Sequence, residues 1–257
     1  MEFIVVPAVS FIASLLSFYS GFGLGTMLLP AFALFFPVNT AVALTAVVHL
    51  LNNLVKGALV FKRASRDVVL RFGLVAIPAS LLGAYVLSRL NDLTPLSSYD
   101  IFGRSFFITP IKLIIAVSMV LFVSWEVFPP FQKITFDRKF LPVGGVFSGF
   151  FGGLSGQQGP LRGAFLVKTG LTPDGFIASS AVIAVLTDIP RLSIYFTSFS
   201  LAGTGKNLTL LAVATGAAIL GVWLGNAWSR QISMKTIKIL VSVMLFVIAL
   251  ALGAGLI

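Results

Sequence analysis

Six long apolar runs restrict the fold of this sequence more than any other feature. Each run has about 20 residues, the length that an α-helix needs to cross the hydrocarbon core of a bilayer. Only 10% of all residues are charged, against about 25% in a typical soluble domain. The sequence therefore predicts an all-α polytopic membrane protein with spans at 40–61, 68–88, 107–128, 175–198, 207–228 and 236–256.

Two further apolar stretches are interrupted by glycines. They consist of segments 3–19 and 25–37, and of segments 140–154 and 160–171. The interruptions read GFGLG (21–25) and GGLSGQQG (152–159). Irregular backbone at membrane depth is tolerated only where it is buried in protein or lines a cavity. We therefore expect both breaks to face a pathway through the protein.

The chain also repeats itself, which indicates an internal duplication. The repeated features are VSMVLFV (117–123) with VSVMLFV (241–247), LLGAYVL (81–87) with ILGVWLG (219–225), and, at an offset of 135 residues, Asn53 with Asp188 and Lys56 with Arg191. The break and the spans follow in the same order in the N-terminal and the C-terminal part of the sequence. We predict two halves, 1–128 and 129–257, each with one broken element followed by three spans.

The basic residues favour one arrangement of these elements. If the second broken element, 140–171, is re-entrant, the basic loops 62–71, 129–139 and 229–238 lie on one side of the membrane. The other side then keeps only Arg89, Arg104 and Lys206. Lys and Arg concentrate on the cytoplasmic side, so this arrangement is favoured. Because three spans are an odd number, the halves are predicted to be inverted repeats. The alternative is a protein with eight full spans.

Composition excludes several classes of function. The chain has no cysteine and one histidine, so disulfides, thiol catalysis and multi-histidine metal sites are excluded, and we expect no metal and no cofactor. The glycine-rich stretches lack the ending of a phosphate-binding loop. The net charge of +10 is interpreted as a topology signal and not as a nucleic-acid surface. No convincing catalytic set is present, so we do not expect an enzyme. The N-terminus lacks a basic region and is interpreted as a membrane element.

The second break carries most of the candidate substrate-binding residues. A helix that starts near Pro160 would direct its first backbone amides into the break, which favours an anion. Arg162 adds a positive charge on the first turn, and glutamine and serine side chains add neutral donors. The alternative is that the glycines only permit close helix packing. The candidates are Ser155, Gly156, Gln157, Gln158 and Arg162, with Gly23, Gly25 and Thr26 at the first break.

Two spans carry polar residues on one helical face. His49, Asn53 and Lys56 follow the 3.6-residue period in segment 40–61, and segment 175–198 holds Asp188 and Arg191. Charges inside membranes usually face the bundle interior, so we assign these five residues to coupling or gating. Three alternatives stay open: a structural ion pair between Asp188 and Arg191, a packing role for His49, and a Lys56 that extends to the membrane interface.

The doubled arrangement resembles the TauE/SafE family of sulfite and organosulfonate exporters. The first copy is GFGLGTMLLPAFALFFPVNTAVALT (21–45), and the second is GGLSGQQGPLRGAFLVKTGLTPDGFIASS (152–180). The resemblance covers nearly the whole chain. It implies a multi-pass transporter of the bacterial inner membrane without a prosthetic group. The second copy departs from the family pattern, because SGQQGPLRG replaces its usual glycine run.

Together these features predict a secondary transporter, an exporter, of a small anion such as sulfite, an organosulfonate or a carboxylate. The cargo would lie between the two breaks near the middle of the membrane. The expected partners are this anion and the lipid bilayer, and self-association is left open. The alternatives are a channel-like anion pore without proton coupling and a membrane assembly subunit that transports nothing.

Overall fold

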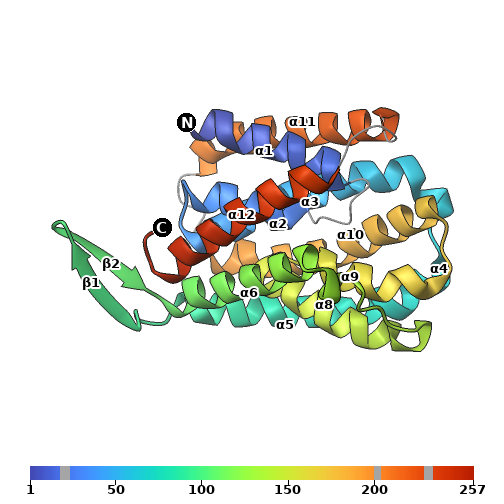
Figure 1. Ribbon diagram of the computed structural model, residues 1–257, viewed down its shortest axis with the longest axis horizontal. Coiled ribbons are helices and arrows are strands. Elements are labelled where there is room, and N and C mark those ends of the chain that lie inside the picture. The colour runs from blue at the N-terminus through green and yellow to red at the C-terminus, as the bar shows by residue number, and fades with distance from the viewer. Residues whose placement is uncertain (18–23, 200–203, 229–233) are drawn as a thin grey trace.

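A computed structural model describes residues 1–17, 24–199, 204–228 and 234–257, and it shows an elongated helical bundle (Figure 1). Five helical stretches are long and apolar enough to cross a membrane: Val38–Arg63, Arg66–Asn91, Pro110–Val127, Pro173–Ser198 and Asn207–Gly225. These stretches confirm the predicted all-α polytopic class. The sixth predicted span corresponds to the helix Met234–Gly253.

Twelve α-helices make up the described part of the bundle. The first half of the chain holds α1 (Glu2–Ser17), α2 (Leu24–Ala33), α3 (Val38–Val60), α4 (Arg66–Val68), α5 (Leu74–Asn91), α6 (Pro110–Val127) and, directly after it, α7 (Pro129–Gln132). The rest holds α8 (Leu141–Ser155), α9 (Gly159–Leu166), α10 (Pro173–Ser198), α11 (Thr204–Trp228) and α12 (Met234–Gly253). A π-helical turn, Val69–Gly73, joins α4 to α5.

A β-hairpin that the sequence reading missed projects from one end of the bundle (Figure 1). Its antiparallel strands are β1 (Ser97–Ile101) and β2 (Arg104–Ile108). Phe102 and Gly103 form the turn with φ angles of 50° and 75°. We predicted an apolar span from residue 107, but residues 107 and 108 belong to the strand. The helix starts at Pro110, where the Thr109 side chain accepts a hydrogen bond from the helix's first turn.

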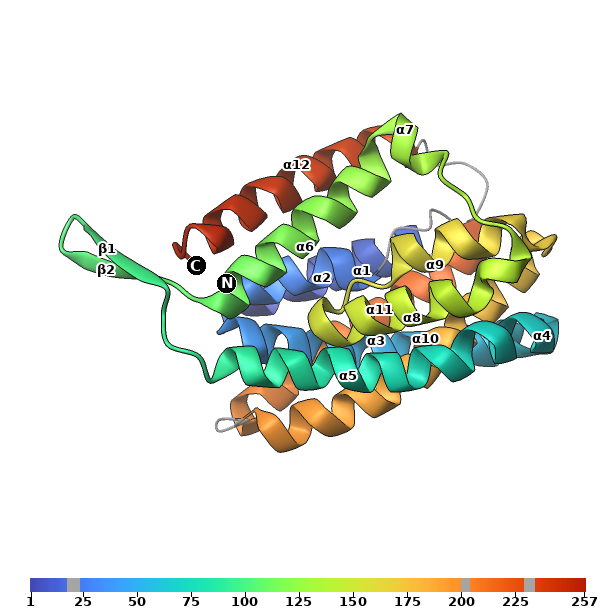
Figure 2. The ribbon, with the colours of Figure 1, turned by 90° about the horizontal axis from the view of Figure 1, so that it is seen from below.

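The second broken element folds back on itself. Gly156, in the left-handed conformation with φ of 75°, ends α8, and α9 then runs back along it (Figure 2). The Phe136 amide, before α8, donates to the carbonyl of Ala164 in α9 at 3.1 Å. The rings of Phe136 and Phe165 stack with centroids 4.2 Å apart. The element therefore begins and ends at the same end of the bundle, which is the geometry that the predicted re-entrant hairpin requires.

Ion pairs bring two of the basic loops together at that end. Arg138 bonds Asp67 at 2.8 Å, and this contact joins loop 129–139 to loop 62–71. Arg63 pairs with Asp174 at the start of α10. The side chains of the third loop, 229–238, lie outside the described residues. Two of the three basic loops therefore lie at one end of the bundle, and the side of the membrane on which they lie stays a prediction.

The two parts of the chain pack on each other reciprocally. Helix α5 packs on α8, and α11 packs on α1. A Cβ at Gly83 of α5 would come within 3.0 Å of backbone atoms of Phe150 and Leu154. A Cβ at Gly221 of α11 would lie 2.5 Å from the Phe11 carbonyl and 3.0 Å from the Leu15 amide. The glycines occupy matching positions in the motifs LLGAYVL and ILGVWLG. This is what two related halves would produce, and the division near residue 128 stays a prediction.

Candidate functional site

The two glycine-rich breaks meet inside the bundle. A Cβ at Gly25, near the start of α2, would lie 2.6 Å from the carbonyl oxygen of Gly156. Helix α2 also contacts α9. The segment that links α8 to α9 therefore lies beside the start of α2. Gly23, the remaining candidate at the first break, lies outside the described residues.

Directly beside the breaks, a buried hydrogen bond joins α3 to α10. Nδ1 of His49 lies 2.6 Å from Oδ2 of Asp188, and the ring donates to the carboxylate. The other oxygen of Asp188 lies 2.8 Å from Nη2 of Arg191 and accepts a bond of 3.2 Å from Nε2 of Gln158. The expected pairing along α10 is present. His49, for which a packing role stayed open, makes a specific polar contact between two helices.

Arg191 and Tyr195 attach α10 to the end of α8. Nη1 of Arg191 donates to the carbonyl of Gly152 at 2.7 Å, and the Tyr195 hydroxyl donates to that of Gly153. The Gly152 carbonyl also accepts from the Gly156 amide at 3.0 Å. The carbonyls of the last turn of a helix lack the usual partners within it, so the bonds from Arg191 and Tyr195 hold the end of α8 in place. Sequence reasoning missed Tyr195. Its position seven residues after Asp188, two turns along the same helical face, was the available signal.

The adjacent glutamines have different environments. Oε1 of Gln158 accepts a bond of 2.8 Å from the Thr187 hydroxyl, so both ends of its amide are used. Both amide atoms of Gln157 are buried and have no partner in the described part of the chain. We expected Ser155 to supply a donor to the break, but its hydroxyl donates to the Phe151 carbonyl within α8. Of the side chains of Ser155, Gln157 and Gln158, that of Gln157 is therefore the one available to a ligand.

Other candidates also have available polar atoms. Nη1 of Arg162 and the hydroxyl of Thr26 are buried without a partner among the described residues. Lys56 is only 5% exposed and donates to the Ser17 hydroxyl at 2.6 Å, so it does not extend to the membrane interface. Asn53 donates to the His49 carbonyl at 2.8 Å, one turn back along α3. The polar face of α3 thus points into the bundle.

Positive charge exceeds negative charge in this buried region. Among the buried described residues, Lys56, Arg162 and Arg191 are cationic, and Asp188 is the carboxylate. Arg162 interacts electrostatically with both Lys56 and Asp188. A charge is costly to bury unless it is paired. The excess therefore favours an anion as the missing partner.

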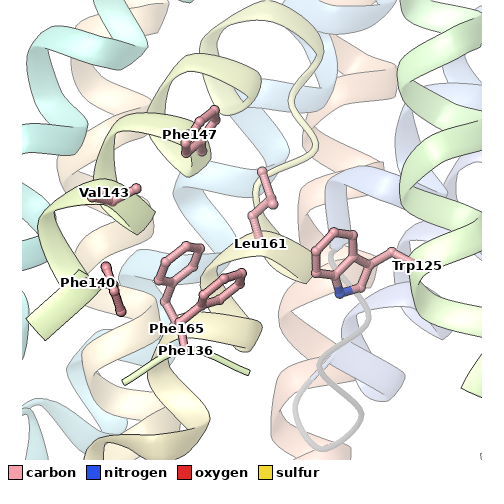
Figure 3. Close-up of a pocket in the computed structure, with 7 residues that line it drawn as sticks. All are labelled: Trp125, Phe136, Phe140, Val143, Phe147, Leu161 and Phe165. Carbon is pink, nitrogen blue, oxygen red and sulfur yellow. The ribbon is translucent and has the colours of Figure 1, made fainter. Parts of the chain in front are cut away.

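An apolar pocket lies on the other side of α9. It has a volume of about 410 Å³ and is lined by aromatic and aliphatic residues. Figure 3 shows Leu161 and Phe165 of α9 there, facing Trp125 of α6. Such a lining offers no partner for a charge, so we assign the candidate anion site to the polar region at the breaks.

Comparison with known proteins places the chain in a family. The profile of the family described as sulfite exporter TauE/SafE matches residues 6–252. The chain belongs to the TauE/SafE family. No curated protein and no solved structure matches it. TauE/SafE membership and the five apolar helical stretches together make this a multi-pass membrane protein of a transporter family for sulfite or related anions.

Proposed function

We propose that this TauE/SafE protein exports a small anion across the bacterial inner membrane and that the anion binds where the two breaks meet. Sulfite, an organosulfonate and a carboxylate fit the charge of this region. Transport and not catalysis is the proposed activity. The observation that carries the proposal is the buried excess of cations over the Asp188 carboxylate.

Unused donors around the breaks support this site. Gln157, Thr26 and Arg162 each keep a buried polar atom that has no partner among the residues the structure describes. Leaving such a group unsatisfied costs about 1–3 kcal/mol, and a bound oxyanion would satisfy several at once. Helices α2 and α9 both start at the breaks, so their first amides add to the attraction for an anion.

Arg162 is the proposed charge partner of the cargo. Arg191 already bonds Asp188 and the Gly152 carbonyl, and Lys56 bonds Ser17. Nη1 of Arg162 has no hydrogen-bond partner in the described ranges of the chain. Gln157, Gly156, Gly25 and Thr26 complete the proposed binding site, and Gln158 and Ser155 support the break from within.

The α3–α10 contact is the proposed gate. His49 on α3 bonds Asp188 on α10, which pairs with Arg191. Asn53 and Lys56 lie buried on α3 one and two turns after His49, and both helices adjoin the breaks. Rocking of the halves 1–128 and 129–257 against each other would open this contact to alternate sides, as in other transporters built from repeats.

Uptake by proteoliposomes tests the proposal. We expect purified protein to carry radiolabelled sulfite or ethanesulfonate. Arg162→Gln should weaken the apparent affinity by about tenfold or more, because it removes a buried charged donor. The matched control is Lys168→Gln, which removes an exposed cation just after α9 and should leave uptake unchanged. Wild-type affinity in Arg162→Gln would refute the site, and a lack of uptake of either anion would refute the function.

A further inference from the structure

We propose that a proton is a second cargo of this protein, carried by the His49–Asp188 pair together with the anion. This inference rests on the proposed function and deepens it. It follows from what the Asp188 carboxylate contacts, which is a set of donors next to the proposed anion site.

Asp188 occupies two donors that lie next to the proposed anion site and that could also bind the anion. One oxygen of its carboxylate lies against Nη2 of Arg191 and accepts from Gln158, and both donors adjoin the break. The Gly156 backbone is close to this arginine, since a Cβ there would lie 3.2 Å from Nη1 of Arg191. An anion at the break and an ionised Asp188 are like charges in a buried region, where their repulsion is poorly screened. Each therefore weakens the binding of the other.

One proton removes this conflict. When the pair takes up a proton, on the imidazole of His49 or on the carboxylate of Asp188, its charge changes from minus one to zero. The neutral pair then repels the anion less and holds Arg191 and Gln158 more weakly, so that both donors can turn toward the anion. When the anion leaves, the proton leaves the same nitrogen or oxygen. No other bond forms or breaks. Proton and anion therefore bind cooperatively, and the coupling is reciprocal.

The surroundings of the pair support this assignment. Nearby are the cations Lys56, Arg162 and Arg191 and the phenol of Tyr195, and α8 has no titratable side chain. The remaining charged or titratable groups on the elements packed against α10, and at its own start, are exposed: Lys62, Arg63, Arg71, Tyr85, Arg89 and Asp174. Among these groups, only His49 and Asp188 form a buried acid–base pair. The surrounding cations oppose an extra proton, and an anion at the break offsets that opposition.

Proton flux in proteoliposomes tests the inference. The internal pH is followed with a trapped dye while an inward ethanesulfonate gradient is applied and valinomycin with potassium clamps the voltage. Ethanesulfonate suits the test because its sulfonate stays ionised at neutral and mildly acid pH. We expect the anion gradient to acidify the lumen. Labelled ethanesulfonate uptake at a fixed gradient should rise as the external pH is lowered.

Two variants test the pair itself, and the ratio of protons to anions reports only on protein that is folded and transports. Asp188→Asn and His49→Gln each remove a titrating group and keep a polar side chain of similar size. We expect either variant to move fewer protons per labelled anion than the wild type. A wild type that carries ethanesulfonate without any proton flux would overturn the inference and leave the proposed function intact. An unchanged proton-to-anion ratio in both variants would reject the pair as the carrier. Lack of ethanesulfonate and sulfite uptake would refute the function and with it the inference.

Discussion

The Gly156 carbonyl lies so close to Gly25 that a Cβ at position 25 would be 2.6 Å from its oxygen. The two breaks, about half the chain apart, are thus in direct backbone contact. In a membrane, glycine permits such an approach because it has no side chain to separate the helices. This contact brings the starts of α2 and α9 to one place.

Gly25→Ala should separate the breaks. The added methyl group meets a backbone atom that cannot rotate away, and such overpacking typically costs about 1–3 kcal/mol. We expect a lower unfolding midpoint in detergent and weaker anion uptake. Gly163→Ala is the control, because a Cβ there meets nothing within 4 Å. Equal midpoints and equal uptake for both variants would argue against the contact.

Removal of Asp188 should leave Arg191 as an unpaired buried charge. Asp188→Asn should lower stability by about 3–5 kcal/mol, the usual loss when one partner of a buried pair is removed. Asp188→Asn combined with Arg191→Met removes both charges, so we expect it to be no less stable than the single variant. Thermal unfolding of the purified variants measures these losses of stability.

Asp174→Asn is the control. It breaks an exposed ion pair and should lower the stability by less than about 1 kcal/mol. Strictly additive losses would show that the buried pair is not coupled.

The reciprocal glycine contacts predict matched defects. Gly83→Ala and Gly221→Ala should each drive an added methyl group into the backbone of the facing helix. Both should reduce the yield of folded protein and its unfolding midpoint to a similar degree. Gly216→Ala on α11 meets nothing within 4 Å and should be tolerated. A severe defect in one glycine variant and none in the other would weaken the argument for related halves.

The hairpin of α8 and α9 predicts the sidedness of single cysteines. The chain has no native cysteine, so each introduced thiol reports alone. Lys139→Cys before α8 and Lys168→Cys after α9 should both react with an impermeant maleimide from the cytoplasmic side. Arg104→Cys on the β-hairpin should react from the opposite side. Reaction of positions 139 and 168 from opposite sides would support eight full spans.

Features that are local in sequence could be predicted before the structure was examined. Glycine and proline mark the break between α8 and α9, and the length of the apolar runs marks the spans. The Asp188–Arg191 pair follows from the helical period alone. The β-hairpin at 97–108 was missed, because its short strands join two longer apolar segments without a strong turn signal.

Contacts between helices were less predictable. His49 and Asp188 are 139 residues apart, and each appeared only as a polar residue on its own helix. The roles of the two glutamines could not be separated either, since Thr187 and Asp188 bond Gln158 only once the segment between α8 and α9 lies beside α10. The repeat did indicate a relation between these helices. Its alignment matched the polar faces of α3 and α10, and the two helices lie together in the bundle.

Location of the bound anion tests the central claim most directly. Selenite has the charge and shape of sulfite, and its selenium atom can be located by anomalous X-ray scattering from crystals grown with it. We expect a selenium peak at the meeting point of the two breaks, within hydrogen-bonding distance of the Arg162 guanidinium and the Gln157 amide. A peak at any other position, in protein that transports selenite, would contradict it.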